Sequence, residues 1–390
     1  MFKEFSDLRH LRNFRRVLLP LSTTFFVYTF GWGLTSPIFS IYVEQVTGSA
    51  TLTGLIFSMS TMAGIFLNLP FGMLEDRLNM KRVLQVALLV YAGLALLYPL
   101  AHTFPELLLL SLGRGVASSF LWLTSWAYVL SYADKQVKGK ETGFFSDLND
   151  LASAAAPLLG GFLAIASFFL PFYLLSVTSL GAFLIASIFL NESPPRQKTA
   201  WSSQVQALTR HMRDRRFVKT ILLVVCFYAF INVYYAFLAI LLHAESLSYE
   251  EIGLVLTVGL LPAVALEVPL GALIDRFGIR RTLSVAILLT AGTALLLPRS
   301  GSLAYVLVVV TAFTISYTWI FIALYSRMSD VMQEDKVAMT GAIATFKDLG
   351  YTVGPLAAGL AIPLLGISTT FLLAGGSLLL LLPLAFSLHD

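Results

Sequence analysis

The chain has 390 residues, of which 57% are hydrophobic and only 12% are charged, and its mean hydropathy is +0.81. Soluble domains contain roughly 45–50% apolar and about 25% charged residues, so the composition excludes an ordinary soluble protein. The net charge of +4 is too small to indicate nucleic-acid binding, and the single cysteine, Cys226, excludes an intramolecular disulfide.

Twelve apolar segments are long enough to cross a membrane. A hydrocarbon core of about 30 Å needs roughly 20 apolar residues of helix, and lipid offers the backbone no hydrogen-bond partners, so each segment is predicted to be helical. In chain order the segments are 17–43, 51–73, 83–101, 105–131, 143–166, 168–191, 219–243, 250–273, 282–298, 302–326, 338–364 and 367–388. The basic N-terminus shows no small-residue cleavage site before the first segment, which predicts a retained helix.

Most of the 26 lysines and arginines fall on one side of the membrane when the N-terminus is placed inside. Because basic residues favour the cytoplasmic side, both termini are predicted to be cytoplasmic. The only long polar connection, 192–218, lies on the same side and links the two halves of the chain. Within it Trp201, Val205, Leu208 and Met212 recur at helical spacing, which fits either an amphipathic helix on anionic lipid or a partly ordered linker.

A short charged stretch, 72–82, joins the second and third segments, and a copy at 271–281 begins 199 residues later. Each half of the chain holds six predicted helices, an even number, so the two repeats have the same orientation in the membrane. Parallel repeats of this kind are typical of transporters that work by alternating access. We therefore predict an all-α polytopic membrane protein whose twelve transmembrane helices form two six-helix bundles, 1–191 and 219–390.

The charged stretch resembles the signature G-x-L-x-D-R-x-x-x-K-R of the major facilitator superfamily. The matching residues are Gly72, Leu74, Asp76, Arg77, Lys81 and Arg82. The first helix is similar to a pattern of drug–proton antiporters at Gly31 and Pro37, with Ser40 in place of a second proline. The resemblance covers nearly the whole chain and implies the fold of that superfamily and a transporter of the twelve-helix drug–proton antiporter type.

Two ionisable residues inside predicted spans are candidates for proton coupling, because charge within a membrane helix is costly and marks function by default. Arg114 lies in the fourth segment, and Glu267 lies in the eighth, where Asn68 is the matched residue of the first half. The resemblance implies a proton-coupled arginine in helix 4, and a structural ion pair is the alternative for Arg114. For Glu267 the alternatives are a gate ion pair and a helix cap.

Asp150 and Asp348 occupy matched positions 198 residues apart, near the cytoplasmic ends of the fifth and eleventh segments. The resemblance implies that helix 5 faces helix 8 and helix 11 faces helix 2, which would bring each aspartate to the charged stretch of the opposite half. Lys347 is expected to extend toward the inner membrane surface. The predicted cytoplasmic latch consists of Gly72, Asp76, Arg77, Lys81, Arg82, Asp150, Asp275, Arg276, Arg280 and Asp348.

The resemblance also implies that helices 1, 4, 7 and 10 line a central cavity. Their aromatic and amide residues would suit amphiphilic or cationic organic molecules, through apolar contact and cation–π attraction. The substrate-cavity candidates are Tyr28, Trp32, Trp122, Trp126, Tyr228, Asn232, Tyr235 and Tyr317. About half of the aromatic residues on these helices are expected to line the cavity, and the others to face lipid or neighbouring helices.

The leading interpretation is a secondary active transporter that exports hydrophobic or amphiphilic small molecules in exchange for protons. The alternatives are gradient-coupled import of a small metabolite, a lipid flippase and a channel-like facilitator. The sequence has no G-x-S-x-G, H-E-x-x-H or P-loop motif, so an enzyme or an ATP-driven pump is disfavoured, and no catalytic residue, metal or cofactor is expected. We expect a monomer in a prokaryotic inner membrane that interacts with the lipid bilayer and a small-molecule substrate, uses a proton gradient and binds no nucleic acid.

Overall fold

The computed structural model describes residues 8, 13–74, 79–133, 137–191, 206, 208–299, 302–332 and 336–388. These residues form helices and no strand, and they include twelve spans long and apolar enough to cross a membrane, which confirms the all-α polytopic fold. Of the predicted linker, Leu208 and Met212 belong to the described residues, whereas Trp201 and Val205 lie outside them.

The first half of the chain, which we call the N half, supplies six of the spans. Capping explains where its helices begin: Asn79 accepts from the backbone of Lys81 at the start of α5, and Thr103 with Glu106 forms a capping box at the start of α6. The elements are η1 (Phe14–Leu18), α2 (Leu19–Thr35), α3 (Phe39–Thr47), α4 (Ala50–Leu74), α5 (Met80–Leu97), η2 (Tyr98–Leu100), α6 (Phe104–Tyr132), α7 (Lys138–Ala166) and α8 (Leu170–Phe189).

The second half, the C half, supplies the other six spans. Its first helix begins at Arg215 rather than at the predicted 219, with Asp214 as the capping residue, and Ser248 with Glu251 forms the second capping box. The elements are α10 (Arg215–Ala244), α11 (Tyr249–Phe277), α12 (Ile279–Leu296), η3 (Leu297–Arg299), α13 (Leu303–Met332), α14 (Lys336–Leu365), α15 (Ile367–Ser377), η5 (Leu378–Leu381) and α16 (Leu382–Phe386).

The prediction of one continuous helix over 17–43 is wrong. The helix is interrupted between Thr35 and Phe39, where Pro37 has no N–H to continue the helical hydrogen-bond ladder. The second charged stretch turns at a single residue, Gly278, between α11 and α12. Its φ of 80° is a left-handed value that side chains other than glycine rarely adopt.

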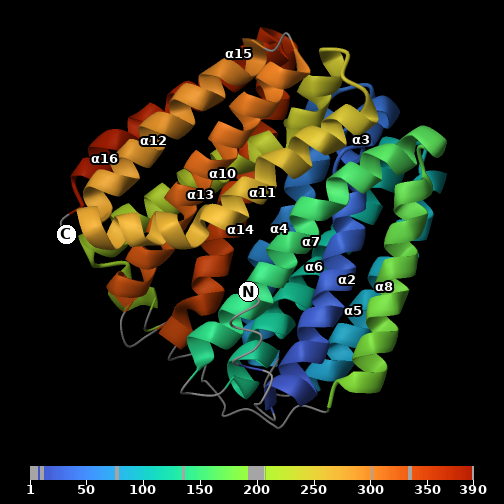
Figure 1. Ribbon diagram of the computed structural model, residues 1–390, viewed down its shortest axis with the longest axis horizontal. Coiled ribbons are helices and arrows are strands. Elements are labelled where there is room, and N and C mark those ends of the chain that lie inside the picture. The colour runs from blue at the N-terminus through green and yellow to red at the C-terminus, as the bar shows by residue number, and fades with distance from the viewer. Residues whose placement is uncertain are drawn as a thin grey trace.

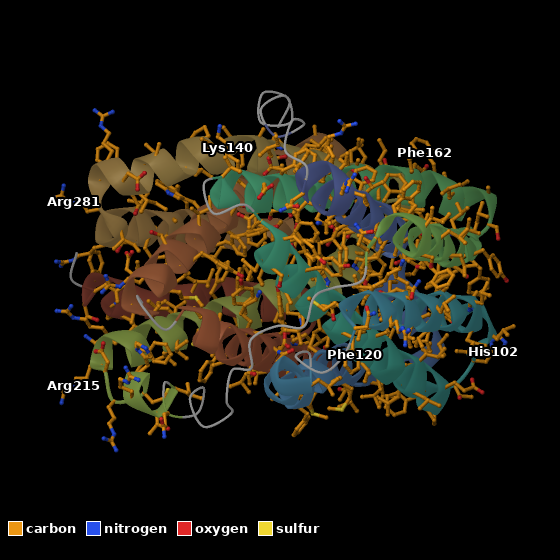
Figure 2. All side chains as sticks on the ribbon, turned by 90° about the horizontal axis from the view of Figure 1, so that it is seen from below. His102, Phe120, Lys140, Phe162, Arg215 and Arg281 are labelled. Atoms are coloured by element: carbon orange, nitrogen blue, oxygen red, sulfur yellow. The ribbon has the colours of Figure 1, made fainter. Side chains whose placement is uncertain are left out.

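The connections between helices lie alternately at two ends of the protein. We call the end with residues 48–49, 101–103, 167–169 and 245–248 the distal end, and the opposite end, where η1 and α10 begin, the terminal end. Figure 2 shows Arg215 and Arg281 at one extremity and His102 at the other. In Figure 1 the two bundles, blue to green and yellow to red, diverge from the region of α3.

The two halves meet along two pairs of helices, α4 with α14 and α7 with α11, which is the pairing that the resemblance implies. At the distal end α4 and α14 pack backbone against backbone. A methyl group added at Gly54 would collide with the Pro355 carbonyl, and one added at Gly359 would lie 2.8 Å from the Ala50 carbonyl oxygen. The Thr51 hydroxyl donates a 2.8 Å hydrogen bond to the Gly359 carbonyl. Only glycine permits this approach.

The contact between α7 and α11 repeats this arrangement. A methyl group added at Gly161 would collide with the Tyr249 backbone, and one added at Gly253 would collide with the Pro157 carbonyl. Together with the α4–α14 contact, these glycine contacts form what we call the distal seam. The seam closes the distal end between the halves, while each half keeps a hydrophobic core of its own.

Candidate functional site

Arg114 on α6 is almost fully buried in the N half, with 7% of its surface exposed. Its guanidinium lies 4.5 Å from the ring centre of Trp32 and 4.6 Å from that of Phe39, and Nη2 donates a 3.0 Å hydrogen bond to the Ser60 hydroxyl. Nε has no hydrogen-bond partner among the described residues.

Cation–π attraction of this kind is strongest where the charge is desolvated. The charge of Arg114 is thus held by two aromatic faces and a hydroxyl. The alternative of a structural ion pair is not seen among the described residues.

Carboxylates of the two halves approach each other where α7 meets α11. Asp150, on α7, accepts a long 3.4 Å hydrogen bond from Ser146, and it is partly buried, as is Glu267 on α11. Glu267 and Asp150 repel each other electrostatically across the interface, and Asp147 adds to the negative charge. A proton bound by either carboxylate would remove that repulsion.

At the other interface between the halves, α4 with α14, the carboxylate of Asp348 is bonded to a neutral residue, Asn68. Asn68 Nδ2 donates a 2.7 Å hydrogen bond to Asp348 Oδ2. Ser58 and Thr61 of α4 also bond to Thr352 of α14, at 2.7 and 3.0 Å. The matched positions Asn68 and Glu267 thus differ in their partners as well as in charge.

Two of the described latch residues, Lys81 and Asp348, make contacts other than the predicted ones. Asp76 and Arg77 lie outside the described residues, and Gly72 lies in the last turns of α4. Lys81 Nζ donates to the Ser187 carbonyl at 2.8 Å within its own half, and Asp348 bonds to Asn68 instead.

The remaining latch residues lie at the surface of the terminal end. Arg82, Asp275, Arg276 and Arg280 are all exposed. Arg276 lies over the Phe277 ring at 5.2 Å, and Arg280 lies over the Phe386 ring at 5.8 Å. The latch therefore stays a prediction for a conformation in which the terminal ends close.

Aromatic residues of the C half form a partly exposed surface. Tyr235 is 47% exposed and lies close enough to Asp150 of the other half for their electrostatic interaction to matter, so it faces the space between the halves. Its hydroxyl lies 3.1 Å from that of Tyr317. Tyr325 and Phe321, both on α13, are 40% and 39% exposed, with ring centres 4.5 Å apart. We call Tyr235, Phe321 and Tyr325 the tyrosine surface, whereas Tyr317, which is only 7% exposed, supports Tyr235 from behind.

The other cavity candidates divide by exposure. Trp122 is 36% exposed, and Trp32 is partly buried under Arg114. Tyr28 is only 3% exposed and packs edge-on against Tyr91 at 5.0 Å, and Trp126 packs against Phe145 at 5.4 Å.

On the C half, Tyr228 is 3% and Asn232 7% exposed. Asn232 donates through Nδ2 to the Tyr351 carbonyl. In this conformation Tyr28, Tyr228 and Asn232 therefore support the lining residues from behind rather than line an opening.

A second feature lies at the distal end, where a cavity of about 240 Å³ is lined by residues of both halves. Glu44 of α3 lines it together with His243, Phe237 and Ile362 of the C half. Burial between the halves raises the pKa of the Glu44 carboxyl, and the nearby His243 opposes this shift. The protonated form of Glu44 is therefore favoured while the distal end is closed.

The sequence pattern of the Major Facilitator Superfamily matches this chain twice, over residues 21–247 and 220–389. The chain belongs to this superfamily. It is an integral membrane protein of this transporter superfamily.

Two characterised relatives are similar along most of their length. Multidrug resistance protein 2 of Bacillus subtilis (strain 168) is 22% identical over 375 residues, covering 93% of this chain and 92% of that protein. Quinolone resistance protein NorA of Staphylococcus aureus is 19% identical over 338 residues, covering 86% and 87%. Both names refer to drug resistance.

Solved structures share the fold. The crystal structure of the nucleoside transporter NupG superposes with a TM-score of 0.80 at 14% identity, over 95% of this chain and 99% of that one. A bacterial homolog of the human lysosomal transporter Spinster, in an inward-facing and unoccupied conformation, gives a TM-score of 0.80 at 15% identity and 96% coverage of both chains.

Sequence reasoning missed Lys347 within this superfamily fold. The prediction that it extends to the membrane surface is wrong, because its Nζ donates a 3.0 Å hydrogen bond to the Tyr325 hydroxyl and lies 5.2 Å from the centre of the Tyr228 ring. A lysine near a helix end ordinarily snorkels. Comparison of the two repeats could have singled out Lys347. The matched residue of the N half is Asn149, so the repeats differ by one positive charge at this position.

Proposed function

We propose that this protein exports hydrophobic or amphiphilic small molecules across a bacterial cytoplasmic membrane, in exchange for protons. The observation that carries this proposal is the similarity over nearly the full length to two proteins named for multidrug and quinolone resistance. The tyrosine surface supports it chemically, because accessible aromatic rings bind apolar cargo of varied shape.

We also propose that the terminal end faces the cytoplasm. The distribution of lysine and arginine favours this orientation. With it, the closed distal seam and the diverging terminal ends correspond to an inward-facing conformation, in which cargo enters from the cytoplasm. Alternating access then requires the seam to open and the terminal ends to close.

In this proposal Glu267 and Asp150 couple proton movement to that change. Their mutual repulsion opposes close contact of α7 with α11 when both are ionised. Protonation would allow the contact, and release of the proton would favour separation. Asp348 has no equivalent carboxylate in α4, because Asn68 occupies that position.

The test is export of a fluorescent cationic dye from proteoliposomes with and without an imposed pH gradient. We expect transport that depends on the gradient in the wild-type protein and is lost in Glu267→Gln. The matched control is Glu245→Gln, which changes an exposed carboxylate at the distal end. If dye flux were the same with and without the gradient, proton coupling would be refuted, and absence of flux for every dye would refute the proposed cargo class.

A further inference from the structure

A lysine inside the C half, Lys347, forms no salt bridge among the described residues, and the charge of the adjacent Asp348 acts on it only electrostatically. Lys347 of α14 donates one hydrogen bond, to the Tyr325 hydroxyl at 3.0 Å, and its Nζ lies 5.2 Å from the Tyr228 ring centre and 5.7 Å from that of Tyr325. The ammonium group has three hydrogens to donate. The adjacent Asp348 directs its carboxylate to Asn68 in the other half. The ammonium therefore keeps unused donor capacity.

The surroundings of Lys347 are accessible from the space between the halves. Three helices converge there, because Tyr228 belongs to α10, Tyr325 to α13 and Lys347 to α14. Tyr325 is 40% exposed and is continuous with Phe321, which packs against its ring. A molecule lying on the tyrosine surface would thus contact both aromatic rings and the ammonium group.

The matched position in the N half shows that the fold does not need a lysine here. Asn149, 198 residues earlier, is 4% exposed, and both polar atoms of its amide have a hydrogen-bond partner. Asn149 Oδ1 accepts from the Thr29 hydroxyl at 2.9 Å, and Nδ2 donates to the Phe145 carbonyl at 2.7 Å. Tyr28 and Tyr228 correspond on the facing helices, so the same site carries a closed amide network in one half and a cation in the other.

We propose that Lys347 binds an anionic group of the cargo, with a carboxylate as the matching chemistry. A charged group at membrane depth is costly. Asp348 acts on Lys347 only electrostatically, because its carboxylate is bonded to Asn68, and a charge-assisted hydrogen bond to an arriving carboxylate would offset the remaining cost. The Tyr325 hydroxyl holds the ammonium in place, and Phe321 contacts the apolar part of the cargo. This inference rests on the proposed function, since it requires cargo to enter between the halves.

The experiment compares two probes that differ in one group. Rhodamine B carries a free carboxylate, and its ethyl ester has the same ring system without that negative charge. Binding of each to the full-length protein in lipid nanodiscs is followed by fluorescence anisotropy. We expect Lys347→Asn, which introduces the residue of the N half, to weaken binding of the acid roughly tenfold. Binding of the ester should change by less than about twofold, and Lys347→Arg should retain preference for the acid.

Ester binding also reports that each variant is folded. An equal loss of both probes in Lys347→Asn would assign Lys347 a structural role and overturn the proposal, as would unchanged binding of the acid. The proposed function fails separately: if neither dye is exported in response to a pH gradient while the acid still depends on Lys347 for binding, the anion site stands and proton-coupled export falls. If the wild-type protein binds neither dye, both are overturned.

Discussion

Gly54→Ala is expected to open the distal seam, because the closed seam has no room for a methyl group at this position. The added carbon would collide with the Pro355 carbonyl oxygen and lie 3.0 Å from Gly359 Cα and 3.1 Å from the Pro355 carbonyl carbon. Carbon atoms make contact at about 3.5–4.0 Å. All of these neighbours are backbone atoms, so no side-chain rotation relieves the clash, and α4 must move away from α14 by roughly 0.5–1 Å.

Overpacking of this kind costs about 1–3 kcal/mol. The cost applies only to the conformation in which the seam is closed, since separation of the halves removes the neighbours. A free-energy difference of that size changes a two-state equilibrium by about 5- to 150-fold. We therefore expect Gly54→Ala to shift the protein toward the conformation that is open at the distal end.

The assay is the distance between spin labels at the distal ends of the two halves, measured by pulsed electron resonance. His102→Cys and Ser302→Cys supply exposed attachment sites, in a background where Cys226 is replaced by alanine. We expect longer distances in Gly54→Ala. Gly93→Ala is the matched control, because a methyl group added there meets no atom within 4 Å. The same distance distribution in both variants would refute the reasoning.

Three further predictions follow from the site. Closure of the distal end should depend on pH through Glu44: its pKa is raised above 4.5 when the end is closed, so the closed form binds the proton more tightly. Acidic pH therefore favours closure, and this preference is lost as the pH rises through the raised pKa. In Glu44→Gln the spin-label distances should no longer vary with pH over this range, and an unaltered pH response would contradict the assignment. Asp348→Asn should weaken the latch and increase labelling, by a polar thiol reagent, of single cysteines near the terminal ends of α7 and α14. Asp330→Asn is the control at an exposed site, and equal labelling in both would rule the latch out. Tyr325→Phe removes the acceptor of the Lys347 ammonium, and we expect it to weaken rhodamine B binding severalfold, about two- to tenfold, with ester binding as the reference. A stronger effect on the ester than on the acid would show that Tyr325 acts only by packing.

The spans could be predicted from sequence because the need for about 20 apolar residues of helix is a local requirement. The duplicated charged stretches indicated two parallel halves, because a repeat is recognised from residue identity and spacing along the chain and needs no knowledge of the packing. The interruption at Pro37 was missed because a proline inside a membrane helix is compatible with a kink or with a complete break. Only packing of α3 against its neighbours distinguishes the two.

Side-chain placement was decided by tertiary structure. The sequence by itself determined that Tyr28 lies on the first helix of one half, and that Tyr228 and Tyr235 lie on the first helix of the other. It also placed Arg114, Glu267 and Lys347 within membrane spans. It did not determine that Tyr235 is exposed while Tyr28 and Tyr228 are covered, nor that Lys347 turns inward to Tyr325. The rotation of a transmembrane helix about its axis is set by contacts with neighbouring helices. An apolar helix carries little of that information in its own residues, so the partners of each charge emerge only when the helices are packed.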